Sequence, residues 1–308
     1  MAFMTSFRKR LRANRWFYLL FLPAAIYFIL FWYFPMYGVS LAFKDYRIVD
    51  GILGSPWADD PLKYFKQFFD GVFFARILNN TLLISFYKLI FGFPIPIILA
   101  LMLNEVKLKA LKRSVQTISY LPYFISWVVI GGMLTELLSP TRGTINRVID
   151  LLGHDPIYFL GDVKYFRSVL VISDIWKTCG WSSVIYLAAI SAINQEEYES
   201  AYIDGASVLQ IMWYITIKAI RPTIVILFIL QLGRILHAGF DQVFNLYNEL
   251  VYEVGDIIDT YIYRVGLIKI QYSLTTAVGL FKNIIGFVLV FLSNYVLRFI
   301  GEGETRLW

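Results

Sequence analysis

The sequence has 308 residues, of which 58% are hydrophobic and 16% are charged, and its mean hydropathy is +0.62. Soluble domains carry about a quarter charged residues, so this composition excludes a conventional soluble enzyme and favours a membrane protein. The formal net charge is +6. Much of this excess lies beside apolar blocks, where it indicates cytoplasmic anchoring rather than nucleic-acid binding.

Several kinds of chemistry are excluded by the residues that are scarce. With one cysteine, Cys179, and two histidines, His154 and His237, a His/Cys metal site is not expected. The chain lacks a Gly-Lys dipeptide, so it has no P-loop for ATP, and it lacks the Gly-x-Ser-x-Gly elbow of hydrolases. We therefore expect a protein that moves or holds a molecule, without a cofactor of its own.

Six apolar blocks are long enough to cross a bilayer, which takes about 20 residues of helix. They cover residues 16–43, 77–103, 114–135, 168–194, 223–245 and 273–297. The blocks predict an all-α membrane protein built as a six-helix bundle, with residues 16–308 forming a single transmembrane domain. Prolines interrupt three of the blocks, as lipid allows where neighbouring helices satisfy the freed carbonyls.

Basic clusters predict the orientation of the chain. The first cluster precedes the first block and consists of Arg8, Lys9, Arg10, Arg12 and Arg15. It predicts that residues 1–15 are cytoplasmic, and the block behind it is too long for a cleaved signal. A second basic cluster, within residues 107–113, lies between the second and third blocks. Two membrane crossings from a cytoplasmic N-terminus also place this connection in the cytoplasm. Six crossings then leave both termini in the cytoplasm.

The connection over residues 195–222 has the pattern of two short helices around a turn. Asn194 is a predicted N-cap with Glu197 three residues on, and Asp204-Gly205 is the predicted turn. Pro222 is expected to end the second helix at the membrane. Because the first helix begins with three glutamates, anionic lipid would repel it. The pattern therefore favours docking on a protein partner over lying on the bilayer.

This connection resembles the EAA loop of permease subunits of ATP-binding cassette (ABC) importers. The resemblance rests on Glu199-Ser200-Ala201, Asp204-Gly205-Ala206, Ile215 and Arg221-Pro222. Ser200 and Ile217-Lys218 depart from the motif, which prefers alanine and Leu-Pro there. Outside the loop, the resemblance is carried by segments 34–38, 43–46, 120–122, 175–181 and 277–280. It covers nearly the whole chain and is closest to maltose-type permeases and their polysaccharide-import relatives.

The resemblance implies a type I importer permease in the bacterial plasma (inner) membrane. It implies a heterodimer with a second permease subunit, two ATPase subunits that use ATP and Mg, and an extracytoplasmic sugar-binding protein. The loop residues expected to contact the ATPase subunits are Glu199, Ala201, Asp204, Gly205, Ala206 and Pro222. This chain would then be a non-catalytic subunit that binds no cofactor and forms half of the pathway for an oligo- or polysaccharide.

Ionisable residues inside the predicted spans are candidates for the substrate pathway, since such residues usually face a cavity or a partner. Lys88, Arg234, His237 and Lys282 fall at similar depth near the midplane. This cationic set would suit an anionic sugar such as alginate or another uronate, and Trp176 could stack on a sugar ring. Alternatively, these cations pair with acids of the second permease or extend toward an interface.

Two other functions stay open from the sequence. A secondary transporter of a small polar or anionic solute is one, although such proteins often show two similar halves and this chain shows no repeat. A membrane-embedded glycosyltransferase or hydrolase is the other, and its only hint is Asp59-Asp60 in an outer connection. Co-purification of an ATPase would separate the importer from both.

Overall fold

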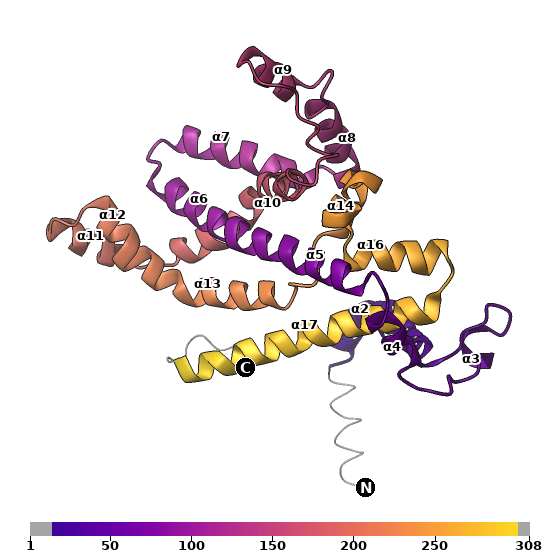
Figure 1. Ribbon diagram of the computed structural model, residues 1–308. Helices are drawn as coiled ribbons and strands as arrows, with labels where there is room; N and C mark the ends of the chain where they lie inside the picture. Colours follow the sequence, from indigo (N-terminus) through magenta and orange to yellow (C-terminus); the bar gives the residue numbers. More distant parts are fainter. Residues whose placement is uncertain (1–13, 301–308) are drawn as a thin grey trace, which may run out of the picture.

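The structure is a computed structural model that describes residues 14–300, with side chains up to residue 295. Within that range the chain is helical, and its only β pairing is an antiparallel bridge between Lys44 and Trp57. Long helices run alongside one another and short helices extend from the ends of the bundle (Figure 1). The all-α prediction is confirmed.

The first predicted span is a continuous helical run, Arg15–Phe43. It consists of α2 (Arg15–Phe28), the π-helical turn η1 (Ile29–Tyr33) and the 3-10 helix η2 (Phe34–Phe43). Helix α2 buries none of its residues within this chain, although the run is almost entirely apolar. Such a surface requires lipid or a partner subunit in place of water.

The second predicted span is a helical run over Phe74–Glu105. It is formed by α5 (Phe74–Tyr87), the π-helical turn η3 (Lys88–Gly92) and α6 (Pro94–Glu105). Single π turns inside α-helices are frequent at functional sites. Here the turn begins at Lys88, one of the predicted pathway residues.

The third predicted span is not one straight helix. Helix α7 (Lys109–Tyr120) continues into η4 (Leu121–Phe124), and α8 (Trp127–Leu137) then leaves at an angle of 102°. The prediction of a single helix over 114–135 was therefore wrong. Ser126 caps the start of α8 by accepting a hydrogen bond from the Val129 N–H at 3.4 Å.

Lys177 of the neighbouring helix stabilises this bend. Its ammonium donates to the carbonyls of Pro122 (3.2 Å) and Tyr123 (2.9 Å), and to that of Ile125. Carbonyls freed by a break in a membrane helix must find donors inside the protein. The break thus depends on a lysine 52 to 55 residues further along the chain.

Helix α10 (Phe166–Ser191) contains 26 residues and packs along α6 and α7. Its predicted range, 168–194, agrees within three residues at each end. The approach to α7 is close at Gly180, where an added Cβ would lie 2.0 Å from the Ser119 carbonyl oxygen. Only glycine fits this crossing.

The fifth predicted span differs from the observed helix. The apolar helix runs over Val208–Leu232 and comprises α12 (Val208–Ile211), η5 (Met212–Thr216) and α13 (Ile217–Leu232). It therefore starts inside the predicted loop and ends before residue 233, so the range 223–245 was wrong. Residues 233–239 form a turn that ends at Gly239, with φ of +95°, and α14 (Phe240–Leu246) follows.

The remaining elements connect these helices or end the chain. They are α3 (Gly51–Gly54), α4 (Lys63–Phe69), α9 (Thr144–Leu151), α11 (Gln195–Ile203), η6 (Glu249–Val251), α15 (Tyr252–Gly255), α16 (Ile258–Ile262), η7 (Tyr263–Ile268) and α17 (Tyr272–Ile300). Helix α17 contains the sixth predicted span. Apolar cores fill the contacts of α10 with α14, of α4 and α5 with α16 and α17, and of α6 and α10 with α13.

In residues 14–300, four helices are long and apolar enough to cross a membrane, or five if the bent pair α7–α8 counts as one span. Helix α10, with 26 residues, is not among them, and it carries Arg167, Asp174 and Lys177.

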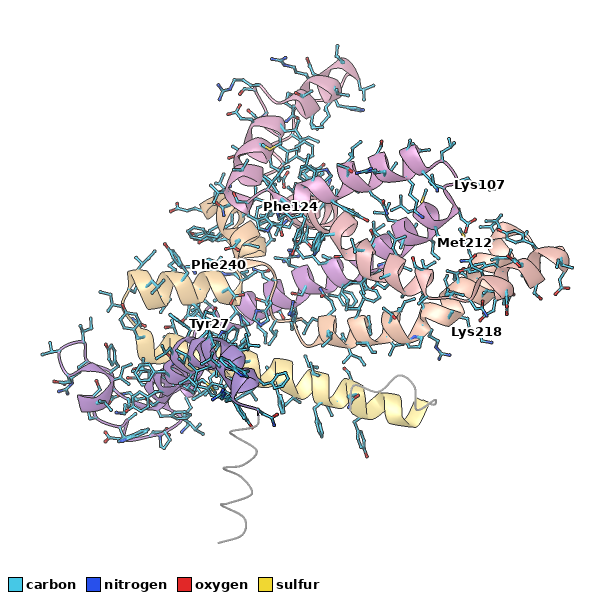
Figure 2. All side chains as sticks on the ribbon, turned by 180° about the vertical axis from the view of Figure 1, so that it is seen from behind. Tyr27, Lys107, Phe124, Met212, Lys218 and Phe240 are labelled. Carbon is cyan, nitrogen blue, oxygen red and sulfur yellow. The ribbon has the colours of Figure 1, made fainter. Side chains whose placement is uncertain are left out.

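The α6–α7 connection, α11 and α12, and the end of α17 lie at one end of the bundle, whereas α3 and α4 lie at the other (Figure 1). In Figure 2, Lys107 and Met212 mark that first end. The N-terminal basic cluster lies outside the described residues, apart from Arg15.

Candidate functional site

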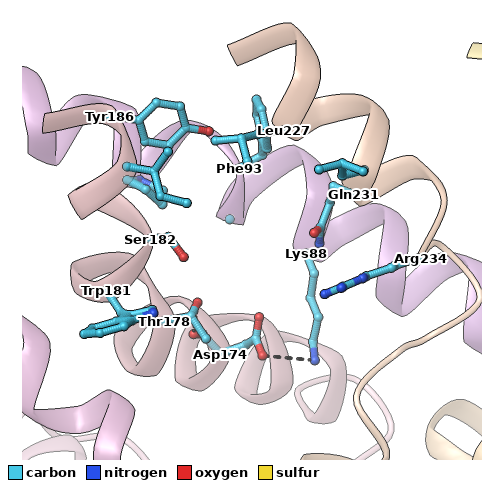
Figure 3. A pocket seen from close by; sticks show the side chains of 14 residues that line it. Lys88, Phe93, Asp174, Thr178, Trp181, Ser182, Tyr186, Leu227, Gln231 and Arg234 are labelled. Atoms are coloured by element: carbon cyan, nitrogen blue, oxygen red, sulfur yellow. Dashed lines mark hydrogen bonds and ion pairs between the residues drawn. The ribbon is translucent and has the colours of Figure 1, made fainter. Parts of the chain in front are cut away.

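A polar cavity of about 290 Å³ lies between α6, α10 and α13 (Figure 3). Helix α10 contributes Asp174, Thr178 and Ser182, which recur every four residues and so share one face of the helix. Gln231 comes from the end of α13, and Arg234 follows just beyond it. The other lining residues are Lys88, Gly92, Phe93, Pro96, Trp181, Ile185, Tyr186, Leu227 and Leu230. Apolar walls with a few convergent polar groups are typical of ligand sites.

Lys88 enters one end of this cavity from the π turn η3. Its ammonium lies 3.3 Å from the Asp174 carboxylate, donates to the Ala238 carbonyl at 2.9 Å, and donates to the side-chain oxygen of Gln242. Gln242 is fully buried and donates to the Leu170 carbonyl at 2.7 Å. The Lys88 charge is therefore balanced within this chain rather than by an acid of a second permease.

Arg234 lies at the same end of the cavity as Lys88, with Phe93 and Tyr186 at the other end (Figure 3). The side chain of Arg234 is exposed, and none of the ion pairs among residues 14–295 includes it. A guanidinium presents five N–H donors in a fixed fork that matches a carboxylate. Arg234 is thus the cation in this cavity that can bind an anion directly.

His237 and Lys282 form a separate cluster. The Lys282 ammonium contacts the Asp259 carboxylate and lies 3.2 Å from His237 Nδ1. Lys282 is buried and His237 is exposed. Of the four predicted cations, the structure therefore brings only Lys88 and Arg234 together at the cavity.

The segment predicted to couple transport to ATP hydrolysis forms two helices around a left-handed turn. Helix α11 contains Glu199 and Ala201, and Gly205 follows it with φ of +77°. Asp204, Gly205, Ala206 and Tyr214 are among the residues that line a groove of about 330 Å³.

Two details of this segment differ from the sequence prediction. Asn194 caps α11, but it accepts its hydrogen bond from the Glu196 N–H at 3.2 Å rather than pairing with Glu197. Pro222 lies inside α13 and does not end the helix. Proline is tolerated within apolar spans, because neighbouring helices and local adjustments satisfy the carbonyl that loses its donor.

A buried hydrogen bond holds α11 against the following helix. The Tyr198 and Thr216 hydroxyls lie 3.1 Å apart, and both side chains are buried. Large apolar side chains around the turn are exposed instead, namely Ile203, Leu209, Trp213 and Tyr214, at 67–86%. An exposed apolar patch of this kind marks a surface for a partner protein or for the membrane.

Comparison with known proteins places the chain in a family. Residues 92–302 match the model of the binding-protein-dependent transport system inner membrane component. The chain belongs to this family. The permease is thus a multi-pass protein of the inner membrane.

The relatives and solved structures agree with this assignment over nearly the whole permease. It is 43% identical to the protein LplB of Bacillus subtilis, over 95% of this chain and 92% of LplB. It is 44% identical to the polygalacturonan/rhamnogalacturonan transport system permease protein YteP of the same organism, over 95% of this chain and 91% of YteP.

In the crystal structure of a bacterial ABC transporter that imports the acidic polysaccharide alginate, a similar chain is 40% identical, with a TM-score of 0.88, over 96% of the permease and 100% of that chain. A second structure of an alginate ABC transporter, in complex with its pentasaccharide-bound periplasmic protein, gives 41% identity, a TM-score of 0.86, and coverage of 95% and 97%. The permease therefore has the type I ABC importer fold.

Residues that line the cavity were only partly found from the sequence. Trp176 does not line it and lies on an exposed side of α10, whereas Trp181 does line it and stacks on Tyr123, with ring centroids 5.0 Å apart. Asp174 and Gln231 were missed as lining residues. The four-residue recurrence of polar side chains from Asp174 to Ser182 is the signal that could have found this face of α10.

The connection over residues 44–69, which contains Asp59-Asp60, is folded by local ion pairs. Asp45 accepts hydrogen bonds from Lys63 and Tyr64, each at 2.7 Å, and the Lys63 bond lowers the pKa of Asp45. Asp60 pairs with Lys66 at 2.6 Å and accepts the Leu62 N–H at 2.9 Å. Of the acidic pair Asp59-Asp60, the only hint of a glycosyltransferase or hydrolase, Asp60 is thus engaged in structural bonds.

Proposed function

We propose that the permease forms half of the translocation pathway for an acidic oligo- or polysaccharide. The observation that carries this proposal is the Arg234 guanidinium, which lies without an ion pair among the described residues at a cavity whose other cation is already neutralised. Relatives named for polygalacturonan and alginate transport support an acidic substrate, because both polymers carry a carboxylate on their sugar units.

Sugar binding in this cavity would use three kinds of contact. Arg234 would bind a uronate carboxylate bidentately. Thr178, Ser182 and Gln231 offer hydrogen bonds to sugar hydroxyls. Trp181, which lines the cavity and is partly exposed, supplies an aromatic surface, and its partner Tyr123 fixes its orientation.

We infer a topology of six spans with both termini in the cytoplasm. This requires counting α7–α8 as one span and α10 as another. The 26 residues of α10 reach about 39 Å at 1.5 Å each, more than the roughly 30 Å of hydrocarbon. Its ionisable residues Asp174 and Lys177 have partners inside the protein, which reduces the cost of placing them in lipid.

We also infer the assembly around this permease. Two ATPase subunits that use ATP and Mg would complete the transporter. One of them would dock on the groove beside Gly205 and the exposed apolar residues around it. The unburied face of α2 and the open side of the cavity would contact a second permease. The outer connection over residues 44–69 would contact a sugar-binding protein. A secondary transporter is not favoured, because the named relatives are importer subunits.

The substrate proposal is tested by reconstituting the transporter with its binding protein and a uronate oligosaccharide. Arg234→Gln should reduce uptake at least tenfold while ATPase subunits still co-purify, since Arg234 lies far along α13 from the coupling segment. Arg234→Lys keeps the charge but loses the forked guanidinium, so its uptake should lie between those of the wild type and Arg234→Gln. Arg142→Gln, at an exposed arginine outside the cavity, is the matched control. Unchanged uptake by Arg234→Gln would reject the assignment.

A further inference from the structure

A second and larger cavity, of about 630 Å³, opens on the other side of α10 from the polar one. One wall is Ser168, Val171, Ile172 and Ile175, spaced as i, i+3, i+4 and i+7 on α10. The facing wall is Tyr87, Phe91 and Ile95, spaced four residues apart on the α5–α6 helix. Apart from Ser168, both walls are aliphatic or aromatic, so we call this feature the apolar groove.

The apolar groove runs along the helices from one membrane surface. From Arg167 to Ile175 there are eight residues, which correspond to about 12 Å of helix. The facing wall begins at Tyr87, beside the mid-depth residue Lys88, and continues about 12 Å further along the helix to Ile95. Half of a hydrocarbon core measures about 15 Å. The groove therefore starts at one membrane surface on α10 and continues past the midplane along the α5–α6 helix, which gives room for an acyl chain.

One end of the apolar groove is cationic. Lys164 and Arg167 line it there, at the start of α10, and α10 leads at its other end to α11 of the coupling segment. This end thus lies at the membrane surface away from the ATPase side. The exposed Lys164 ammonium lies beside its own neighbour Tyr165, at 5.3 Å from the ring centroid.

The charges at this end are not neutralised by the chain. Arg167 donates to two neutral acceptors, the Val254 carbonyl at 3.2 Å and the Asn80 side-chain oxygen at 2.7 Å. No ion pair among residues 14–295 includes Lys164 or Arg167. The nearby Asp162 carboxylate accepts the backbone N–H of Lys164 at 2.8 Å. Two cations at one end of the apolar groove match the chemistry of a phospholipid, in which a phosphate is joined to acyl chains.

We propose that the apolar groove binds one anionic phospholipid, with an acyl chain between α10 and the α5–α6 helix and the phosphate beside Lys164 and Arg167. Ile172 is 67% exposed and lies in the middle of the groove, so a lipid chain would cover apolar surface that this chain leaves open. The charge match selects lipid over a helix of the second permease, since an apolar helix would leave both cations unpaired. The lipid holds α10 against the α5–α6 helix, next to the Lys88–Asp174 contact.

The experiment uses the whole transporter in nanodiscs that contain traces of a photoreactive lipid. The probes are phosphatidylglycerol and phosphatidylcholine with a diazirine in one acyl chain, and labelled peptides are located by mass spectrometry. We expect phosphatidylglycerol to label the segments around Phe91 and Ile172 about fivefold more than phosphatidylcholine does. Lys164→Gln should lower the phosphatidylglycerol label about fivefold, the effect of one surface cation, without changing the phosphatidylcholine label.

Two variants fill or spare the apolar groove. Ile172→Trp should remove the label of both lipids from these segments, whereas Val184→Trp, on the same helix outside the groove, should not. Lys269→Gln is the matched control for Lys164→Gln, because Lys269 is another exposed lysine outside the groove. Equal labelling by the two lipids, an unchanged label in Lys164→Gln, or a photoreactive residue 172 that cross-links to the second permease would each overturn the proposal. Subunit co-purification confirms that each variant assembles.

Discussion

The ammonium of Lys88 lies where a side chain on residue 239 would begin. A Cβ placed on Gly239 would be 2.9 Å from the Lys88 nitrogen, and the backbone there has φ of +95°, a conformation that other residues rarely adopt. The ammonium cannot easily move away, because the Ala238 carbonyl, Gln242 and Asp174 all contact it. The turn after α13 and the buried lysine therefore depend on each other.

Gly239→Ala should destabilise the permease by roughly 2–4 kcal/mol, of which about 1–2 kcal/mol reflects the positive φ and the rest the displaced ammonium. The measurement is thermal unfolding of the purified transporter. Gly153→Ala is the matched control, since Gly153 has φ of +81° and open space around its Cβ position. Equal losses in the two variants would show that the Lys88 contact contributes nothing.

The Lys88–Asp174 pair should behave as a coupled unit. Lys88→Met leaves the Asp174 carboxylate without its cation and the Gln242 side-chain oxygen without its hydrogen-bond donor. We therefore expect the free energy of unfolding to fall by roughly 2–3 kcal/mol. Adding Asp174→Asn should recover part of that loss. A double-mutant cycle on unfolding temperature measures the coupling. Purely additive effects would contradict an energetic link. Continued loss of uptake in a stable double variant would instead assign Lys88 to substrate binding.

Gly180→Ala should be poorly tolerated, because the added methyl would overlap the Ser119 carbonyl where α7 and α10 cross. Overpacking of this kind costs about 1–3 kcal/mol and sometimes more. We expect a low yield of assembled transporter and a reduced unfolding temperature. Gly279→Ala, in α17 with nothing within 4 Å of its Cβ position, should be neutral or slightly stabilising. Similar behaviour of the two variants would argue against the close crossing.

Gly205→Val should uncouple ATP hydrolysis from uptake, because a β-branched residue resists the left-handed turn between α11 and α12. Gly205→Asn is the informative control, since asparagine tolerates this conformation and open space surrounds the Cβ position. We expect near-normal uptake in Gly205→Asn and at least a tenfold loss in Gly205→Val, with substrate-stimulated ATPase activity lost in parallel. Normal coupling in Gly205→Val would remove this segment from the coupling role.

Local patterns predicted those parts of the fold that local residues determine. The first, second and sixth apolar blocks became helices with nearly the expected ends. The two helices around Gly205 also follow from caps and a turn residue within a dozen positions. The fifth block failed because hydropathy does not distinguish a continuing helix from a buried turn. Gly239 was the local signal that the helix does not extend through residue 245.

Pairing of charges could not be read from the sequence, since each partner comes from another helix. Lys88 and Asp174 are 86 residues apart, and the carbonyls that Lys177 satisfies are more than 50 residues away. Depth along a helix indicated that Lys88 lies near the midplane but not what it contacts. Arg234 could be separated from the other candidates only after their partners were known.

Helix α10 is fastened at several heights along its length. Arg167 joins it to Asn80 near one membrane surface, Asp174 joins it to Lys88 at mid-depth, and Lys177 joins it to the carbonyls at the bend. A slide of one turn would break all three attachments together, whereas a tilt that carries α5 and the bend along would break none. Any opening and closing of this half of the transporter should therefore proceed as a rigid-body rotation in which α10, α5 and the α7–α8 bend move together, rather than as the movement of a single helix.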